Sequence, residues 1–540
     1  MDRRTWMRAT GGFLGGLTAA QVLAGAPATA AQPGGSVVDV REFGAVGDGS
    51  TDDTAAFRAA LTAAREGVGG AVLLVPPGSY PLSESLRLGP GTTVHAYGAH
   101  LFRTGDTSSL LRNYATGEGP VAGYEGDGGI TVLGGTWDMR GSRFHATCPA
   151  FVLTHAEGFV VRDVTILDVP EAHAIELNAV RRVRIEDCLF DGVWVAPGEP
   201  AVPNRHEAVQ ITGATHAANL PAPQYDGTPC QDVLISGCTV RNTASTTTAP
   251  YDALCGDHYV AAPEGRRPLH RGIRVLGNRV ESSGAYGIRA TDWQQSVIAG
   301  NTIESPQVTG IYVSSGSGNP LEDITVSDNI VRGAGTGGGI VVSNTESGRN
   351  SAISVIGNTV RDTRGETGIY VSRTDAAVID ANTVVVTRHP SGGNAQGIQV
   401  QESPHARITG NHVTDIDGDG IGVDTGSTGV LLAHNTVLGA SRNGLALASS
   451  DIAAHDNRFH ATGSGSGTYA IRIGGNAVSV SCQGNVSRPG EGDTAEAAIG
   501  VMAGSRGTWI TANDLRGWGT QGLLDKGTGT VASNNPSAAV

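Results

Sequence analysis

Lysine is almost absent from this chain of 540 residues. The 37 basic residues include a single lysine, Lys526, so a mechanism that needs a catalytic lysine is nearly excluded. The formal net charge is −14. An acidic chain of this kind is repelled by the phosphates of nucleic acids and of anionic membrane surfaces, so we expect neither as a partner.

Aromatic residues and long hydrophobic runs are also scarce. Aromatics make up 5% of the chain, whereas glycine alone accounts for 79 residues. This composition does not fit a set of long packed helices and suits many tight turns around a thin aliphatic core. The one long apolar run, residues 11–25, is too short to span a bilayer, and no later segment qualifies. We therefore expect no membrane anchor.

The first 30 residues have the pattern of an export signal. Arg3 and Arg4 precede the apolar run, and Ala28-Thr29-Ala30 offers a small-residue cleavage site. Residues 2–7 resemble a twin-arginine signal, and an ordinary secretory signal is the alternative. Either signal predicts a secreted, extracellular protein in which residues 31–36 form a linker.

One short pattern recurs ten times between Arg271 and Leu515. It consists of a small or acidic residue, an asparagine, one or two further residues, and an aliphatic or Phe residue, and successive asparagines lie 22 to 29 residues apart. The asparagines are Asn278, Asn301, Asn329, Asn358, Asn382, Asn411, Asn435, Asn457, Asn485 and Asn513. A period of this length indicates a solenoid of stacked coils.

A second phrase, such as Gly310-Ile311-Tyr312-Val313, runs in step with the first. Each copy is too short for a helix and alternates with period two, so each predicts a strand. Strands that pair with their equivalents one coil above and below form a parallel β-helix, in which in-register asparagines stack on one another. We expect an all-β, single-domain solenoid over residues 81–520, acting as a monomer.

The two ends of the solenoid are predicted to differ. Residues 37–80 contain an amphipathic helix that Thr51 or Asp52 caps and that runs through Glu66, followed by a buried strand. This helix can cap the exposed edges and core of the first coil. Residues 521–540 read as a C-terminal tail.

Six cysteines are spread along the chain: Cys148, Cys188, Cys230, Cys238, Cys255 and Cys482. Six cysteines allow fifteen pairings if all of them bond, and sequence does not choose among these. Cys188 and Cys238 occupy the asparagine position of the repeat. Stacked free thiols and a disulfide both fit these two positions.

The segment from Phe43 to Phe57, FGAVGDGSTDDTAAF, resembles the N-terminal signature of the pectate-lyase superfamily of right-handed β-helix proteins. Polygalacturonase-like hydrolases, alginate epimerases and phage tail-spikes also carry it. The resemblance implies a right-handed helix and a secreted or surface protein that acts on polysaccharide. It also implies a site on the outer face of one sheet. Because fold does not determine function, the reaction must be argued from the site.

Long loops interrupt the repeat in one region only, at residues 195–205, 213–229 and 242–270. Long loops in a regular solenoid are where clefts are built. Aligning the strand phrases of the same region places one outward residue of each coil in a single column. This predicted column contains Glu176, Gln210, His258, Arg289 and Tyr312.

The predicted column can support β-elimination on a uronic acid. Gln210 and Arg289 would neutralise the substrate carboxylate, and His258 and Tyr312 would serve as base and acid. Trp293, next to the Arg289 strand, could stack on a sugar ring or simply belong to the surface of the fold. Glu176 and Gln210 could also be ordinary solvated positions of a ladder.

Hydrolysis is the second reaction that the region allows, because it needs two carboxyl groups. Candidates are Glu176, Glu207, Asp226, Asp252 and Asp257, and Asp226 could instead be a turn former. Glu207 and Asp226 are also candidate substrate-binding residues. The third alternative is a non-catalytic glycan-binding protein. We slightly favour elimination.

No cofactor is expected. Asp415, Asp417, Asp419 and Asp424 raise the possibility of calcium, but ordinary turn chemistry also explains this sequence. No residue spacing in the chain resembles a zinc site.

Overall fold

The computed structural model describes residues 36–66, 70–114, 119, 121–196, 206–215, 225–257, 267–316, 318–345, 348–388, 394–491 and 494–537. The predicted export signal lies outside these residues. So do most of the predicted loop 195–205, the middle of the loop 213–229, and residues 258–266, which include His258.

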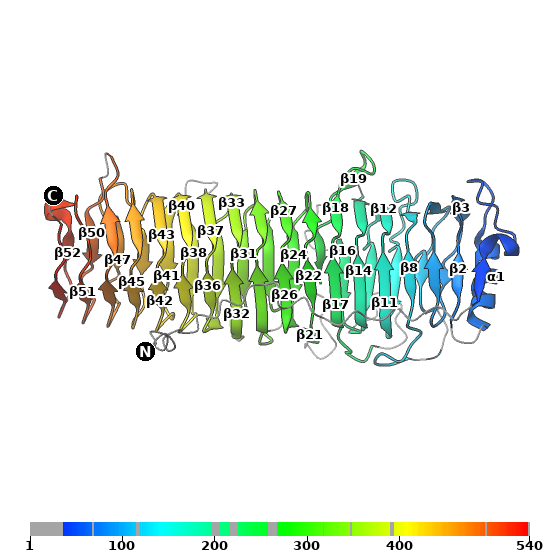
Figure 1. Ribbon diagram of the computed structural model, residues 1–540, viewed down its shortest axis with the longest axis horizontal. Coiled ribbons are helices and arrows are strands. Elements are labelled where there is room, and N and C mark those ends of the chain that lie inside the picture. Colours follow the sequence, from blue (N-terminus) through cyan, green and yellow to red (C-terminus); the bar gives the residue numbers. More distant parts are fainter. Residues whose placement is uncertain are drawn as a thin grey trace, which may run out of the picture.

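The chain forms a long solenoid of short parallel strands (Figure 1). Three faces run along its length. Face 1 is a single sheet of 21 strands. Its strands are β1 (Val37–Asp39), β2 (Val72–Leu74), β5 (Thr93–His95), β8 (Thr131–Leu133), β11 (Glu157–Arg162), β14 (Arg181–Glu186), β17 (Gln231–Ser236), β21 (His270–Arg271), β22 (Arg274–Leu276), β25 (Trp293–Gln294), β26 (Ser296–Ala299), β29 (Glu322–Ser327), β32 (Asn350–Ile356), β35 (Thr374–Asp375), β36 (Val378–Asp380), β39 (Arg407–Thr409), β42 (Leu431–Ala433), β45 (Ala453–His455), β48 (Ser481–Gln483), β51 (Trp509–Thr511) and β53 (Val531–Ser533).

Face 2 is a sheet of 16 strands, of which only β19 pairs antiparallel, with β15. Its strands are β3 (Gly78–Leu82), β6 (Ala99–Arg103), β9 (Thr136–Asp138), β12 (Thr165–Pro170), β15 (Leu189–Trp194), β18 (Thr239–Arg241), β19 (Thr248–Ala249), β23 (Arg279–Val280), β27 (Thr302–Glu304), β30 (Ile330–Arg332), β33 (Thr359–Thr363), β37 (Thr383–Thr387), β40 (His412–Ile416), β43 (Thr436–Ala440), β46 (Arg458–His460) and β49 (Val486–Arg488).

Face 3 carries the predicted column and is built from two sheets that meet where β20 contacts β24. The first contains β4 (Leu86–Arg87), β7 (Leu111–Arg112), β10 (Phe151–Thr154), β13 (Ile175–Asn178), β16 (Glu207–Thr212) and β20 (Ala253–Gly256). The second contains β24 (Tyr286–Thr291), β28 (Thr309–Ser314), β31 (Gly338–Ser343), β34 (Thr367–Ser372), β38 (Ala395–Gln401), β41 (Gly418–Val423), β44 (Leu445–Leu447), β47 (Tyr469–Ile473), β50 (Ala497–Val501) and β52 (Leu523–Asp525).

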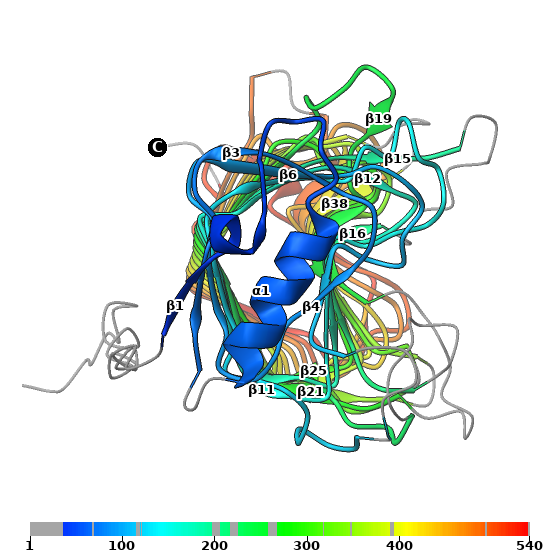
Figure 2. The ribbon, with the colours of Figure 1, turned by 90° about the vertical axis from the view of Figure 1, so that its right-hand side faces the viewer.

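The one α-helix among the described residues, α1 (Thr54–Glu66), covers the N-terminal end of the solenoid (Figure 2). Asp52 Oδ1 accepts the Thr54 N–H at 3.0 Å, and the Asp53 carbonyl accepts the Phe57 N–H at 3.0 Å as the helix begins. The buried side chains of the helix include Phe57 and Leu61, which close the core of the first coil. Short 3₁₀ turns occur at Val40–Phe43 and Gly519–Gln521. The all-β solenoid with an N-terminal capping helix is therefore confirmed. In the described part of the chain, no helix has the length and apolarity needed to cross a membrane.

The stacked asparagines form a continuous ladder at the turn between faces 1 and 2. Asn358 is representative: its Nδ2 donates to Asn382 Oδ1 at 3.0 Å and to the Val326 carbonyl at 2.9 Å. Its own Oδ1 accepts the backbone N–H and the Nδ2 of Asn329, both at 3.0 Å. The same bonds recur from Asn278 to Asn535, one coil further than the ten repeats of the sequence. The stacking predicted from the repeat is therefore confirmed.

The residue before each asparagine explains why the pattern begins with a small or acidic residue. Gly277, Asp328 and Ala381, for example, have φ values of 62°, 55° and 54°. Glycine reaches this left-handed region without strain, and aspartate does so more readily than most residues. Cys238 enters the same column, because its N–H donates to Asn278 Oδ1 at 2.9 Å. All six cysteines are buried free thiols.

Candidate functional site

The register of face 3 places the predicted column residues in adjacent coils. Glu176 pairs with Gln210, and Gln210 pairs with Gly256. A Cβ atom at Gly256 would lie 2.8 Å from the Cβ of Arg289, so Arg289 occupies the next coil of the column. Arg289 in turn pairs with Tyr312. The sequence alignment had put His258 at the position that Gly256 occupies, and that placement was wrong.

The loop-rich coils bury much of this column. Glu176 and Gln210 are each 2% exposed, so neither is a solvated ladder position. Arg289 and Tyr312 are half-buried. The column thus changes from buried polar groups to partly open ones where β20 meets β24. His258 lies outside the described residues, and its role stays a prediction.

Arg289 lies beside two tyrosine rings at this junction. The rings of Tyr286 and Tyr312 stack with centroids 5.2 Å apart and an interplanar angle of 11°. The guanidinium carbon of Arg289 lies 5.4 Å from the centre of the Tyr286 ring. Among the described residues, Nε and Nη1 of Arg289 are buried and have no hydrogen-bond partner. Buried donors of this kind are costly unless something accepts from them, and a carboxylate is the best match for an arginine fork.

Tyr286 was not among the residues predicted from the sequence. Strict alternation along β24 would turn its side chain inward, with Ile288 and Ala290. A Cβ at Gly287, however, would meet the core side chain of Ile303, so Gly287 faces inward in its place. Tyr286 and Arg289 therefore both lie on the outer side. The Gly-Ile phrase carried this signal, since a glycine before an inward isoleucine allows two consecutive core positions.

Acid and histidine side chains form a second cluster at the turn between faces 2 and 3. His206 lies between two carboxylates, with Nε2 3.4 Å from Glu171 Oε2 and Nδ1 3.3 Å from Asp252 Oδ2. Next to it, His173 Nδ1 lies 3.5 Å from Glu207 Oε2 and 3.0 Å from the Glu207 carbonyl oxygen. Three consecutive coils contribute to this cluster. The sequence identified Glu207 and Asp252 but missed both histidines and Glu171.

Asp257 is part of a buried ion cluster. Its carboxylate pairs with Arg267, whose Nη1 lies 3.4 Å from Asp292 Oδ2. The exposed fractions of Asp257, Arg267 and Asp292 are 4%, 6% and 1%. Ser315 Oγ also donates to Asp292 at 2.8 Å. This arrangement ties together the two chain segments on either side of residues 258–266 and leaves Asp257 committed to an ion pair.

Asp226 holds two chain segments together. One of its oxygens accepts the Gly123 N–H at 2.8 Å and the other accepts the Thr228 N–H at 3.0 Å. Although burial opposes the shift, these N–H donors lower the pKa of the Asp226 carboxyl. These contacts fit the turn-forming role that the sequence left open for Asp226.

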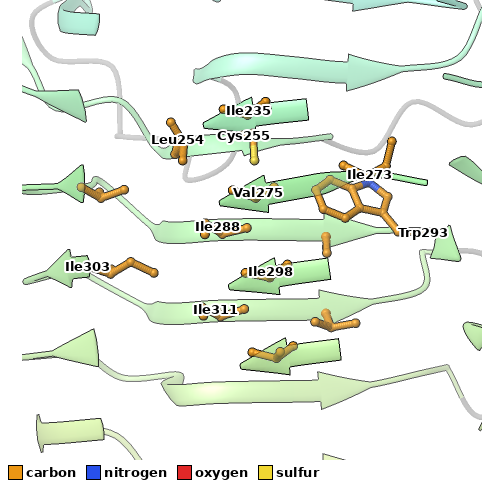
Figure 3. Close-up of a cluster of buried hydrophobic side chains, with 14 of the residues drawn as sticks. Ile235, Leu254, Cys255, Ile273, Val275, Ile288, Trp293, Ile298, Ile303 and Ile311 are labelled. Atoms are coloured by element: carbon orange, nitrogen blue, oxygen red, sulfur yellow. The ribbon is translucent and has the colours of Figure 1, made fainter. Parts of the chain in front are cut away.

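Trp293 does not lie on the surface. It is 0% exposed and packs in the core close to Ile273 (Figure 3). A ring that is wholly inside the solenoid cannot stack on a sugar, so the prediction of a sugar-binding tryptophan was wrong. The physical reason is that Trp293 belongs to β25 of face 1, beyond the turn that ends the Arg289 strand.

The four aspartates that suggested calcium contact three different residues. Asp415 and Asp417 lie 2.8 Å and 3.3 Å from the guanidinium nitrogens of Arg388. Asp419 accepts from Asn443 at 2.6 Å, and Asp424 accepts from Gln399. In the ranges that the structure describes, no group of three or more His, Cys, Asp or Glu side chains could hold a metal ion.

Sequence models of two families match the chain. The model described as "Right handed beta helix region" matches residues 149–348 and 338–515. The model described as "Rhamnogalacturonase A/epimerase, pectate lyase-like" matches residues 37–101, which include the FGAVGDGSTDDTAAF segment. The resemblance to the pectate-lyase superfamily is therefore confirmed.

Individual relatives are distant. The chain is 23% identical over 305 residues to the plasmin and fibronectin-binding protein A of Streptococcus pneumoniae, which covers 50% of this chain and 39% of that protein. The chain thus spans well under half the length of this curated relative.

Among solved structures, the Streptococcus pneumoniae surface protein and adhesin PfbA matches with a TM-score of 0.61 and 19% identity, over 72% of this chain and 99% of that chain. An Azotobacter vinelandii mannuronan C-5 epimerase A-module matches with a TM-score of 0.43 and 16% identity, over 84% and 99% of the two chains. At these identities the likeness concerns the fold alone. Because the first family model covers well over half of its residues, the chain belongs to the family of proteins with a right-handed β-helix region.

Proposed function

We propose that this protein cleaves a uronic-acid-containing polysaccharide by β-elimination. The observation that supports the proposal is the environment of Arg289, whose Nε and Nη1 are buried without a partner in the described part of the chain. A uronate carboxylate can accept from either of these donors, which point in different directions. The stacked rings of Tyr286 and Tyr312 offer a partly open surface on which the sugar ring can pack.

Elimination starts with removal of the proton on the carbon next to the carboxylate. Pairing that carboxylate with Arg289 withdraws charge and stabilises the carbanion-like transition state. The electron pair then forms a carbon–carbon double bond as the glycosidic C–O bond breaks, and the leaving oxygen takes up a proton. Tyr312, paired with Arg289, is the candidate acid among the described residues, and His258 stays the candidate base. Gln210 lies two coils away, across Gly256.

The test is incubation with a panel of uronate and neutral polysaccharides, with ultraviolet absorbance and reducing ends read in parallel. An elimination product is unsaturated and absorbs in the ultraviolet, so both signals should rise together on a uronate. Arg289→Ala should abolish them. Arg472→Ala is the matched control, because Arg472 lies in the same ladder of face 3, far along the solenoid at β47, and should leave both signals unchanged. Reducing ends without absorbance would refute elimination.

Hydrolysis is the alternative that such a result would favour. The cluster of Glu171, His206 and Asp252 brings two carboxylates to opposite sides of one imidazole. An inverting hydrolase needs two carboxyl groups roughly 6.5–9.5 Å apart with room for a water, so His206 would have to move aside for these two carboxylates to act as the pair. Asp252→Asn would then lower the yield of reducing ends, whereas Arg289→Ala would not.

Binding without catalysis is the remaining candidate. The likeness to a pneumococcal surface adhesin, and the distant relation to a plasmin and fibronectin-binding protein, favour it. Binding of a glycan or a host protein without release of any product would support this function. In every case we propose an exported protein that acts as a monomer outside the cell, without a metal or other cofactor.

A further inference from the structure

We propose that a cavity near the N-terminal cap is a second saccharide-binding site, separate from the Arg289 region. The cavity has a volume of about 410 Å³, which falls in the range of small-molecule sites, roughly 300–1,000 Å³. Its lining includes Arg65 at the end of α1, Arg87 of β4, Asn113 and Tyr114 after β7, and Thr154 of β10. With Glu125 and Asp127, which also line it, five separate segments of the chain meet around one hollow.

The polar groups around the cavity are held in place by their own contacts. Asp127 Oδ2 lies 2.7 Å from Arg87 Nη2 and 3.3 Å from Arg65 Nη2. Asn113 Nδ2 donates to the carbonyls of Asp127 and Thr154, at 2.9 Å and 2.7 Å. Asn113 Oδ1 accepts the Thr154 N–H at 2.9 Å. A ligand would therefore meet a wall that is already organised and would not have to order it.

One buried polar atom of this wall, the hydroxyl oxygen of Thr154, lacks a partner among the described residues. Thr154 is 2% exposed. A buried hydroxyl without a partner costs the free energy of its lost hydration. A hydroxyl group of a bound molecule can accept a hydrogen bond from Thr154.

The charges around the cavity indicate which chemistry it recognises. Arg65 and Arg87 are balanced by Glu125 and Asp127, so the lining has no excess of either sign to attract a polyanion. The lining combines side chains with planar hydrogen-bonding groups and the half-buried ring of Tyr114. This combination suits the hydroxyl groups of a sugar ring. The recognised groups are hydroxyls, which neutral and acidic sugars share.

The cavity is well separated from Arg289 along face 3. The ladder runs from Arg87 through Arg112, Val152, Glu176, Gln210 and Gly256 to Arg289. Six coil steps of about 4.8 Å place Arg87 about 29 Å from Arg289, and four steps place the coil of Thr154 about 19 Å from it. A single glycan chain that lies along the solenoid could therefore occupy both. The cavity does not depend on the reaction proposed for Arg289.

The test uses the whole protein and measures binding by calorimetry with two probes of equal length, a neutral hexasaccharide and a hexauronate. The key variant is Thr154→Val, which removes only the hydroxyl and keeps the shape. Its oxygen makes no hydrogen bond among the described residues, so the variant should fold at least as stably as the original protein. We expect it to weaken binding of at least one probe by about three- to tenfold.

The control is Thr508→Val. Thr508 is 1% exposed and its hydroxyl also lacks a partner in the described part of the chain, but it lies near the opposite end of the solenoid. It should bind both probes as the original protein does. Equal affinity of Thr154→Val and Thr508→Val would overturn the proposal and would leave ordered water as the partner of these atoms.

The two probes and an Arg289→Ala variant separate this site from the proposed reaction. If Thr154→Val weakens the binding of both probes, the site recognises the hydroxyls that the two probes share. If it weakens the binding of the hexauronate alone, the acidic glycan is the ligand. Loss of activity in Arg289→Ala with unchanged Thr154-dependent binding supports both sites. Thr154-dependent binding without any activity in the original protein supports the cavity and refutes only the reaction.

Discussion

Replacing one interior asparagine of the ladder should destabilise the protein far more than replacing the last one. In Asn358→Ala, three buried groups lose a partner: the Val326 carbonyl, the Asn329 N–H, and the Asn329 Nδ2, which keeps its second bond to the Ile298 carbonyl. Each orphaned buried group costs about 1–3 kcal/mol. Because neighbouring effects are not additive and the site can relax in part, we expect a total loss of about 3–6 kcal/mol.

Asn535→Ala is the matched control at the C-terminal end of the described ladder. Asn535 also accepts the N–H and Nδ2 of the preceding asparagine, Asn513, and donates to the Ile510 carbonyl at 2.8 Å. The side chain is only half-buried, however, so water can replace these bonds. The expected loss is about 1 kcal/mol.

The assay is urea unfolding followed by circular dichroism, with hydrogen exchange at the Asn329 amide as a local measure. The denaturation midpoint should fall for Asn358→Ala, and exchange at Asn329 should accelerate. A loss below about 1 kcal/mol for Asn358→Ala, or equal losses for the two variants, would refute the reasoning from buried hydrogen bonds. It would mean that strand pairing alone sets the stability of the turn.

Three further predictions concern single side chains. Arg267→Ala removes the arginine that pairs with the buried carboxylate of Asp257, so stability should fall by about 3–5 kcal/mol. The double variant Asp257→Asn with Arg267→Gln should lose less, and equal losses in urea unfolding would argue against a mutual ion pair. Tyr312→Phe should lower activity on the uronate by tenfold or more, while Tyr370→Phe, in an identical TGIYVS strand, should not; equal effects would remove Tyr312 from the reaction. Burial, with Arg267 nearby, lowers the pKa of His270 from 6.5 to about 3. Between these pH values only the unfolded chain binds the proton. The contribution of His270 to the free energy of unfolding is therefore complete above pH 6.5 and is lost as the pH falls toward 3, by about 1.4 kcal/mol per pH unit. His270→Asn should remove this part of the acid sensitivity, and an unchanged pH profile would contradict the assignment.

The fold was readable from the sequence because the repeat reports directly on coil geometry. Each asparagine marks one turn, and each Gly-Ile phrase marks one strand of face 3. These signals are local and survive the insertion of loops. The same regularity predicted the ladder, in which a bond such as that from Asn301 to Asn329 spans a single coil.

The site was harder to predict because it lies where the regularity is broken. The loop 242–270 interrupts the repeat, so the position of each residue in its coil cannot be counted from the neighbouring coils. His258 was therefore predicted at the position where the strand pairing places Gly256. Trp293 was assigned to the surface because alternation does not show where a strand ends and the chain turns to another face. His206 was missed because its carboxylate neighbours come from coils before and after it.

The asparagine ladder also gives the solenoid an electric dipole along its axis. Ten consecutive side-chain bonds, from Asn278 to Asn535, all run from the Nδ2 of one coil to the Oδ1 of the next. Amide dipoles in a hydrogen-bonded chain polarise one another and add when they point the same way. The column is therefore a dipole with its positive end toward the C-terminal coil, a polarity that the net charge of −14 does not reveal.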